Sequence, residues 1–476
     1  MYDVAIIGAG VVGSSLAYYL SQYDISILML EASNDVSNGT SKANTAIIHA
    51  GYDPRVGTLM AKYNVEGSLI MKDLCTKLDV PYINNGAMVL AFSDEELEHV
   101  NKLYQRGIDN GVKDLSVLNA EQVLKLEPNI TKNVKGALLA KTSAIVSPWE
   151  LTYALALTAV KNGVELKLNN KVTAITKEKD IFKITTDKSQ YQSRYIFNAS
   201  GIHADKIHEL IGKKEFTITP VRGQYYLLDK SQGNKCTHTL FQCPNALGKG
   251  VVVSPTVHGN LIVGPDAETI NNEDKSTTSS GLAYVKEKAA KSIDSLNYGE
   301  NIRNFAGIRA KSDRKDFIVE ESKSVSNFFN LAGMASPALS SAPAIALAAV
   351  DWLLSKEKLN KKENYITERK KIRFNKLSAE EKNELIKKDP SYGRIICRCE
   401  TITEGEILAC IDSEIPPASI DGVKRRTNSG MGRCQGGFCS ERIAMILMDK
   451  LGLKYNEILQ DEQGSYILSS EAKEGY

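Results

Sequence analysis

Short apolar segments near the start of the chain have the length of buried strands. Residues 2–8, YDVAIIG, and residues 25–31, ISILMLE, are mostly apolar, and residues 11–23 between them have a helical pattern. A strand, a helix and a second strand within about 30 residues form the βαβ unit of a parallel, doubly wound sheet. The pattern therefore predicts a Rossmann-like α/β domain in this part of the chain.

Strand patterns of a different kind occupy the middle of the chain. The segments VTAITKEKDIFKITTD and SQYQSRYIFNASG indicate antiparallel strands that lead back to the first sheet. The segments TPVRGQYYLLD and GVVVSPTVHGNLIVGP are rich in strand formers and are interrupted by turn residues, which favours a separate antiparallel sheet. The expected fold class is therefore mixed α/β (α+β) with two sheets.

The pattern changes again after the second sheet. Residues 356–389 have mixed charge and are rich in lysine, which predicts a solvated, charged helical connector over 356–392. A cysteine-containing module follows at 393–450, and residues 451–476 form a C-terminal tail. Such a connector favours a module that moves relative to the rest of the chain.

Length and composition limit the class of protein. A chain of 476 residues is too long for one compact core, so two or three domains are expected. The net charge of +2 argues against nucleic acid as a partner. The most apolar run, APAIALAAVDWLL, is too short for a transmembrane segment, and MYDVAIIG lacks the features of a signal peptide. These observations favour a cytoplasmic protein, with attachment to the inner face of the membrane through a partner left open.

A glycine motif lies between the first strand and the first helix. Gly8, Gly10 and Gly13 form G-x-G-x-x-G, whose glycines permit a tight turn, close approach of pyrophosphate and close helix–sheet packing. The helix N-terminus offers N–H groups to phosphate, and Glu31, at the end of the second strand, suits a ribose diol. The motif predicts a dinucleotide site and disfavours NADP, and by itself it leaves FAD and NAD open.

Four of the eight cysteines lie close together in the C-terminal module. Cys397 and Cys399 form one local pair, and Cys434 and Cys439 form the other. No export signal is recognised, so these thiols are interpreted as metal ligands and not as disulfides. Glycines around the second pair let the backbone wrap closely around sulfur, which favours an iron–sulfur cluster. Zinc remains the alternative, although zinc ribbons usually repeat C-x₂-C.

Four further segments carry a resemblance to a known family. They are GTSKANTAIIHAGYDPRVGTLMAK (39–62), NASGIHAD (198–205), FAGIRA (305–310) and LAGMASPALSSAPAIALAAV (331–350). Over about residues 1–355 the chain resembles the glycerol-3-phosphate dehydrogenase/oxidase and L-2-hydroxyglutarate oxidase branch of the D-amino-acid-oxidase-like flavoproteins. The cysteine module resembles the bacterioferritin-associated-ferredoxin-like [2Fe-2S] domain at the C-terminus of anaerobic glycerol-3-phosphate dehydrogenase A-type subunits.

The resemblance implies FAD, and a discontinuous FAD domain into which an antiparallel substrate domain is inserted. The FAD-binding parts are expected at about 1–75, 145–212 and 300–355, and the substrate domain at about 76–144 and 213–299. The helix after GMASP would direct its N-terminal amides at the flavin and stabilise the reduced ring. The cofactor-binding positions are expected to be Gly8, Gly10, Gly13, Glu31, Thr40, Ser41, Val172, Gly201, Gly333 and Ser340.

Three residues are expected to act on the substrate. In the family that the chain resembles, a histidine in the position of His49 stands beside the flavin as the leading base, and histidine titrates near neutral pH. Arg309 matches the arginine that clamps the anionic end of the substrate, although Ala310 replaces a usual proline. Lys249 resembles a second cation of the phosphate-binding members, and Tyr52 is a weaker candidate for orienting substrate or flavin.

The two cofactors together indicate the direction of electron flow. A flavin accepts a hydride, whereas an iron–sulfur cluster carries single electrons, so electrons are expected to leave for an acceptor protein, partner subunits or a quinone-linked acceptor. The resemblance implies oxidation of a small anionic alcohol, sn-glycerol 3-phosphate, to dihydroxyacetone phosphate. L-2-hydroxyglutarate, another 2-hydroxy acid or an amine is an alternative substrate. An electron-transfer or iron-handling protein without its own substrate is the alternative from another class.

Overall fold

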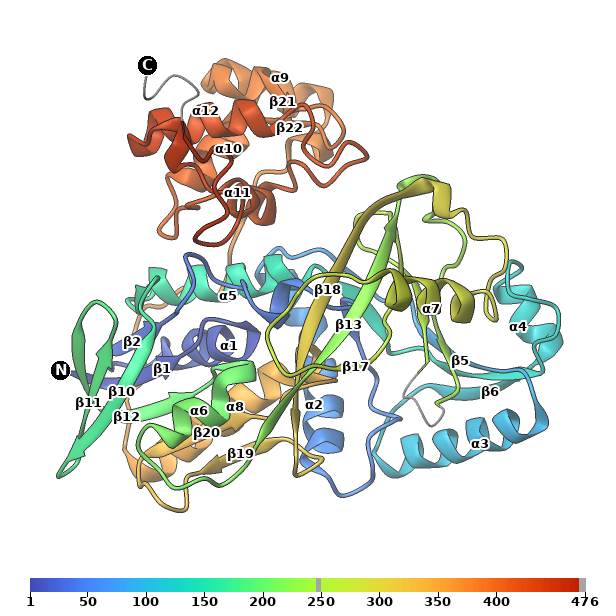
Figure 1. The fold of residues 1–476 in the computed structure, drawn as a ribbon, viewed down its shortest axis with the longest axis horizontal. Helices are drawn as coiled ribbons and strands as arrows, with labels where there is room; N and C mark the ends of the chain where they lie inside the picture. Colours follow the sequence, from blue (N-terminus) through green and yellow to red (C-terminus); the bar gives the residue numbers. More distant parts are fainter. Residues whose placement is uncertain (245–249, 471–476) are drawn as a thin grey trace.

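The computed structural model describes residues 1–244 and 250–470, which form two large sheets with their helices and a separate C-terminal module (Figure 1). Lys249 lies outside the described residues. Its expected role therefore stays a prediction.

The first sheet has a parallel centre, as the N-terminal pattern predicts. Its order is β10-β11-β12-β1-β2-β9, and β20 pairs with β12 and with β19. Strands β1, β2, β9, β12 and β20 are parallel to one another, whereas β10, β11 and β19 add antiparallel pairs at the edges. The bounds are β1 (Tyr2–Ile7), β2 (Ile27–Leu30), β9 (Glu165–Lys167), β10 (Val172–Glu178), β11 (Ile181–Thr186), β12 (Gln190–Asn198), β19 (Ile318–Glu321) and β20 (Phe328–Ala332).

Apolar helices pack beside this sheet and form the largest core. The core contains residues of α1 (Val11–Leu20), α2 (Leu59–Lys77), α5 (Pro148–Lys161) and α8 (Ala338–Lys356). Within the described chain, α8 is long and apolar enough to cross a membrane by length and composition alone. However, 56% of its apolar window is buried, and α8 packs against α1 and α2. Its apolar composition is explained by the core that it fills.

The second sheet is antiparallel except at one pair, β14 with β5. Its order is β17-β13-β16-β15-β14-β5-β7-β6, with β18 on β13. The bounds are β5 (Ala87–Ala91), β6 (Leu115–Asn119), β7 (Gly136–Ala140), β13 (Ile218–Leu228), β14 (Thr239–Gln242), β15 (Val252–Pro255), β16 (Leu261–Gly264), β17 (Glu268–Thr269) and β18 (Asn301–Ser312). Since β18 belongs to this sheet, the boundary expected at residue 300 lies one strand too early.

Shorter elements complete the two domains. Three helices lie in the segments that carry the second sheet: α3 (Asp94–Asp109), α4 (Ala120–Leu126) and α7 (Ser279–Ala289). The helix α6 (Ala204–Glu209) follows β12, and a small sheet contains β3 (Ile47–Ile48), β4 (Tyr82–Ile83) and β8 (Ala144–Val146). Short 3₁₀ turns lie at η1 (Thr40–Lys42), η2 (Gly201–His203), η3 (Lys230–Gln232), η4 (Tyr298–Glu300), η5 (Phe374–Lys376), η6 (Pro390–Gly393) and η7 (Tyr455–Glu457).

The charged segment 356–392 differs from the predicted solvated helix. After α8 ends, its only α-helix is α9 (Ala379–Lys388), and the part before it is largely irregular. The buried carboxylate of Glu150 accepts hydrogen bonds from Arg369 at 3.2 Å, Lys371 at 3.2 Å and Arg373 at 2.8 Å. Most of the segment is exposed, as its composition predicts, but these three cations hold it along the first domain because they compensate a buried charge on α5.

The Glu150 cluster predicts a specific acid sensitivity. Burial opposes ionisation, but the three cations outweigh it and lower the pKa of Glu150 from 4.5 to about 2. A depressed pKa stabilises the fold above the ordinary value, and this stabilisation is lost as the pH falls from 4.5 towards 2. We expect this component of the free energy of unfolding to be roughly 3 kcal/mol.

Urea unfolding of the wild type and of Glu150→Gln across this pH range measures that component. All other carboxylates titrate in both proteins, so the difference between the two curves reports Glu150. If the free energy of unfolding depended on pH in the same way in both proteins, the result would contradict the lowered pKa of Glu150.

The C-terminal module has its own core. It contains β21 (Ile395–Cys397), β22 (Ile402–Thr403), α10 (Glu404–Ile411), α11 (Ile420–Thr427) and α12 (Ser440–Leu451). Its core also includes Ile458, which is 1% exposed. The module therefore extends beyond the expected boundary at 450, and at least the first part of the predicted tail belongs to it.

Buried charges hold the module against the first domain. Asp35 accepts hydrogen bonds from Arg425 at 2.8 Å and from Arg426 at 2.7 Å, and all three side chains are almost fully buried. The guanidinium of Arg426 also lies 4.5 Å from the ring centroid of Tyr153 on α5. Breaking such a buried pair costs about 3–5 kcal/mol, so the module is docked at this point and not merely tethered.

Candidate active site and cluster site

The glycine turn after β1 has no room for side chains. Gly8 has a φ of +104°, and a Cβ built on it would lie 2.5 Å from the carbonyl oxygen of Ala199. A Cβ on Gly13 would lie 2.0 Å from the carbonyl oxygen of Gly8. Gly10 is the N-cap of α1 and provides no side-chain cap. The backbone is therefore open to a phosphate at the helix N-terminus, as the motif predicts.

Glu31 lies at the end of β2 beside this turn. Its carboxylate accepts hydrogen bonds from the backbone N–H groups of Ala9 and Ser33, each at 2.8 Å. Burial raises the pKa of Glu31, and these hydrogen bonds act in the opposite direction. The side chain is thus fixed at the edge of the dinucleotide turn, where the sequence places it.

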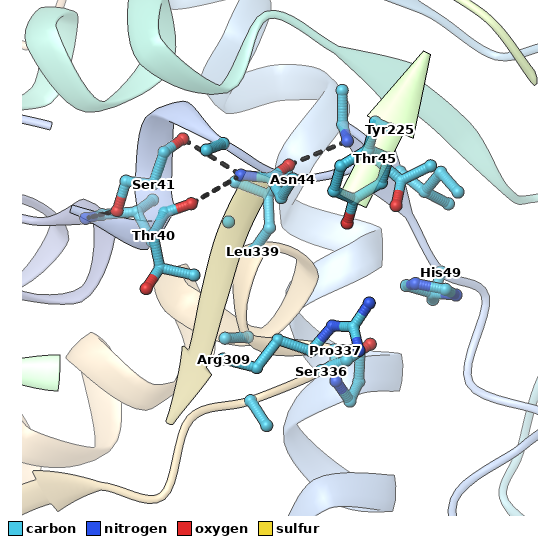
Figure 2. Close-up of a pocket in the computed structure, with 17 residues that line it drawn as sticks. Thr40, Ser41, Asn44, Thr45, His49, Tyr225, Arg309, Ser336, Pro337 and Leu339 are labelled. Atoms are coloured by element: carbon cyan, nitrogen blue, oxygen red, sulfur yellow. Dashed lines mark hydrogen bonds between the residues drawn. The ribbon is translucent and has the colours of Figure 1, made fainter. Parts of the chain in front are cut away.

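A narrow cleft continues from the turn towards the entry of α8 (Figure 2). One wall contains Thr40, Ser41 and Asn44, and the Asn44 amide donates to the carbonyl oxygens of both other residues at 3.1 and 3.0 Å. Ser41 Oγ also accepts from the first N–H group of α1 at 2.9 Å. The helix α8 begins after Pro337 without a side-chain cap. The N–H groups at the start of α8 and the glycine turn would suit the flavin ring and the pyrophosphate of an FAD molecule, respectively.

His49 lies where this cleft meets a larger cavity. Its backbone N–H group donates to Ser340 Oγ at 2.8 Å, and its carbonyl oxygen accepts from Asn64 Nδ2 at 2.6 Å. The imidazole ring lies 5.6 Å from the ring of Phe241, centroid to centroid. Ser340 is fully buried, so the structure gives it a role in holding His49, and it does not line either cavity. Tyr52 is also buried and lines a small space beside His49.

The larger cavity has a volume of about 580 Å³ and several cationic side chains. Arg309 lines both this cavity and the cleft, and its Nη2 donates to the carbonyl oxygen of Asp266 at 3.5 Å. Lys311 follows two residues later on β18 and lines the same cavity. Alternate residues of a strand face one side, so the spacing in GIRAK was a signal that the sequence analysis missed. Arg55 and Lys315 add further cations from loops.

The remaining expected cofactor residues differ in whether they line the two cavities. Gly333 has a φ of +70° and lines the larger cavity. Gly201 has a φ of +62° at the start of η2, and Val172 is buried at the start of β10. Neither Gly201 nor Val172 lines the two cavities, so their contacts with FAD stay a prediction.

The four predicted cysteine ligands gather as two pairs. The Sγ atoms of Cys399 and Cys434 are 3.6 Å apart, and a side-chain hydrogen bond joins Cys397 with Cys439. In residues 1–244 and 250–470, no three His, Cys, Asp or Glu side chains surround one possible metal position. A [2Fe-2S] cluster takes two ligands at each of two irons, whereas structural zinc takes four at one point. The paired arrangement therefore favours the binuclear cluster.

Close backbone packing supports this cluster site. Burial opposes ionisation of Cys434, but N–H groups of residues 436–438 donate to it and lower its pKa, which favours the thiolate that a metal requires. A Cβ on Gly432 would lie 2.3 Å from the Cβ of Cys399, so a side chain there would displace a ligand.

We expect Gly432→Ala to lower the iron content per chain while FAD content stays at the wild-type level. Gly393→Ala is the matched control, because a Cβ on Gly393 would make only ordinary contacts of 3.4 Å or more with Ile386. Iron analysis and the visible spectrum measure both cofactors. A full iron content in Gly432→Ala would show that the loop tolerates the displacement.

Comparisons with known proteins agree with both sites. The profile described as FAD dependent oxidoreductase matches residues 3–352, and the profile described as BFD-like [2Fe-2S] binding domain matches residues 395–449. The chain is 51% identical over 476 residues to the glycerol 3-phosphate dehydrogenase of Caloramator mitchellensis, covering 99% of both chains. It is 36% identical over 375 residues to the glycerol 3-phosphate oxidase of Mycoplasma genitalium, covering 76% of this chain and 98% of the relative.

A solved structure extends the agreement to three dimensions. Dithionite-reduced L-α-glycerophosphate oxidase from Mycoplasma pneumoniae with FAD bound has a TM-score of 0.74 and 32% sequence identity, and the match covers 77% of this chain and 98% of that chain. The predicted fold class and the predicted FAD and [2Fe-2S] cofactors are confirmed, and the zinc alternative is set aside. The chain belongs to the FAD dependent oxidoreductase family and carries a C-terminal BFD-like [2Fe-2S] binding domain.

Proposed function

We propose that this protein oxidises sn-glycerol 3-phosphate to dihydroxyacetone phosphate and releases the electrons through its [2Fe-2S] cluster. The observation that carries the proposal is the cavity where His49 and the cations of β18 meet beside the dinucleotide cleft. The names of the relatives in C. mitchellensis and M. genitalium favour the same substrate.

Arg309 and Lys311 account for the anionic end of the substrate. A guanidinium group binds phosphate through two parallel charge-assisted hydrogen bonds, and a lysine adds a compact positive charge. Both residues project from one face of β18 into the cavity, so they can bind the same phosphate group. This contact orients the substrate with its secondary hydroxyl directed away from β18.

His49 is the proposed base at the other end of the substrate. FAD supplies the acceptor for the hydride that leaves the carbinol carbon. His49 removes the hydroxyl proton, so that the carbonyl group forms as the hydride departs. The backbone N–H group of His49 donates to Ser340 Oγ and its carbonyl oxygen accepts from Asn64 Nδ2, and these hydrogen bonds hold the residue at the junction of the two cavities.

A substrate screen under anaerobic conditions tests the proposal. Glycerol 3-phosphate is expected to bleach the flavin absorbance rapidly, whereas L-2-hydroxyglutarate, sarcosine and proline are expected to leave it oxidised. Bleaching by L-2-hydroxyglutarate alone would indicate that the protein oxidises a 2-hydroxy acid and not glycerol 3-phosphate. No bleaching by any of these compounds would favour an electron carrier without its own substrate.

The acceptor is proposed to be a one-electron protein or a quinone-linked subunit, reached from the cytoplasmic side. A cluster near the surface supports this route, because Cys399 is exposed. Cell fractionation, with and without high salt, tests a cytoplasmic or peripheral location. Retention in the membrane after a salt wash would contradict it.

A further inference from the structure

The long β13–β18 pair extends towards the C-terminal module (Figure 1). The two strands are paired from Ile218 and Ser312 at one end to Leu228 and Asn301 at the other. Along β18, alternate residues share a face, and Arg309 and Gly307 on that face line the cleft. The next positions on the same face are Phe305 and then Arg303.

An aromatic pair lies directly beyond the cleft on this face. Tyr225 is 2% exposed and lines the cleft, and it is paired across the strands with Phe305. Their rings are stacked, with centroids 4.8 Å apart and an interplanar angle of 11°. The pair therefore forms a continuous π contact that begins at the wall of the cleft and points towards the module.

The far end of the same face contacts the cysteine-bearing loops. Arg303 Nη1 donates to the side chain of Gln435 at 3.4 Å, and Gln435 follows Cys434 in the chain. Phe305 and Arg303 are two residues apart, which corresponds to about 7 Å along the strand. Two residues of β18, the Arg303 side chain and its hydrogen bond to Gln435 therefore connect the stacked rings with Cys434.

Ion pairs fix both cysteine loops to the same strand ends. Arg433 pairs with Asp229 at 3.0 Å and with Glu300 at 3.1 Å, just beyond the ends of β13 and β18. Lys230 pairs with Glu400 at 2.8 Å, and Glu400 follows Cys399. The Asp35 contact, in contrast, holds α11, which contains no cysteine. Of these contacts, those at the β13–β18 ends therefore position the cluster loops.

We propose that this face is the path of electrons from the flavin to the cluster, with the Tyr225–Phe305 stack as its central contact and the ion pairs as positioning contacts. Electronic coupling between two redox groups decreases steeply with the distance between them, especially across empty gaps. Packed rings on a continuous strand reduce both the distance and the gaps that an electron must cross. Each electron transfer along this path removes one electron from the reduced flavin and adds one to the oxidised cluster. Two transfers return the flavin to its oxidised state, and its protons leave to solvent. The external one-electron acceptor reoxidises the cluster after each transfer.

The proposal rests on the two cofactors and not on the identity of the substrate. The test therefore reduces the flavin of the holoenzyme with a light flash and a sacrificial donor under anaerobic conditions. Flavin absorbance and the EPR signal of the reduced cluster are followed with time. The variants are Phe305→Leu, which removes the stack, and Phe305→Tyr, which keeps it.

Tyr226→Leu is the matched control, because Tyr226 faces the other side of β13 and packs edge-on against Tyr298, with centroids 4.9 Å apart. We expect the EPR signal to appear severalfold more slowly in Phe305→Leu, and at the wild-type rate in Phe305→Tyr and Tyr226→Leu. The yield of flash-reduced flavin and the iron content should be equal in all proteins. A wild-type rate in Phe305→Leu, or an equal slowing in Tyr226→Leu, would overturn the path.

The positioning contacts have a separate test. The double variant Asp229→Asn/Glu300→Gln removes both partners of Arg433 without altering a ring or a cysteine. It is expected to slow the appearance of the EPR signal while iron content and flavin bleaching by glycerol 3-phosphate remain unchanged. An unchanged EPR rate would remove the ion pairs from the proposal. Failure of glycerol 3-phosphate to bleach the wild type would instead count against the proposed function alone.

Discussion

Replacing His49 by alanine is expected to lower the rate constant of flavin reduction by about 10²–10⁴-fold, the usual contribution of a positioned general base. The contacts from Ser340 and Asn64 are made to the backbone of His49, so the substitution leaves them in place. The FAD content should therefore match that of the wild type. Stopped-flow bleaching with glycerol 3-phosphate measures the rate, and the visible spectrum measures the FAD.

His203→Ala is the control for this experiment. Its side chain is 50% exposed, lies 3.5 Å from the carboxylate of Glu273 and lines neither cavity, so its removal should leave the rate unchanged. A His49→Ala protein without FAD would assign His49 to cofactor binding. A wild-type rate of bleaching would exclude His49 as the base.

The second large effect is expected at the anion site. Arg309→Met should lower kcat/KM for glycerol 3-phosphate by about 100-fold, because each net hydrogen bond to a charged group contributes about 1.5–3 kcal/mol. Arg309→Lys should recover only part of this loss, since an ammonium group lacks the planar fork. Steady-state kinetics with an artificial acceptor, together with inhibition by inorganic phosphate, measure the effect.

Arg314→Met provides the matched arginine control. Arg314 follows β18 and pairs with Glu320, and it lines neither the cleft nor the larger cavity. The control should therefore show wild-type kcat/KM and wild-type inhibition by phosphate. Arg309→Met with an unchanged kcat/KM would place the phosphate on other cations of the cavity.

The parts of the molecule that sequence analysis predicts correctly are those with local causes. The turn of Gly8 and Gly13 follows directly after an apolar strand, and the acid at Glu31 follows the next strand. Each of these features depends on residues within one βαβ unit, where strand, turn and helix patterns are visible in order. The four cysteines are likewise recognised because their spacing alone distinguishes them from the other thiols.

The contacts that the sequence did not reveal join residues far apart in the chain. Lys311 becomes relevant only when β18 forms the wall of the cavity, and the hydrogen bond between Ser340 and His49 forms only when α8 packs beside β3. The charged connector resembles a solvated helix until Glu150, more than 200 positions earlier, is placed beneath it. Charge patterns do not reveal which charges will be buried together.

Local patterns in the chain were enough to locate a dinucleotide turn and two cysteine pairs, because each of these features is formed by near neighbours. How the turn and the cysteine loops are connected became visible only in the folded protein. The β13–β18 pair joins the cleft to the cysteine loops, and Asp35 fastens the module through a buried charge. Such contacts depend on the packing of distant segments, for which a single sequence contains no local signal.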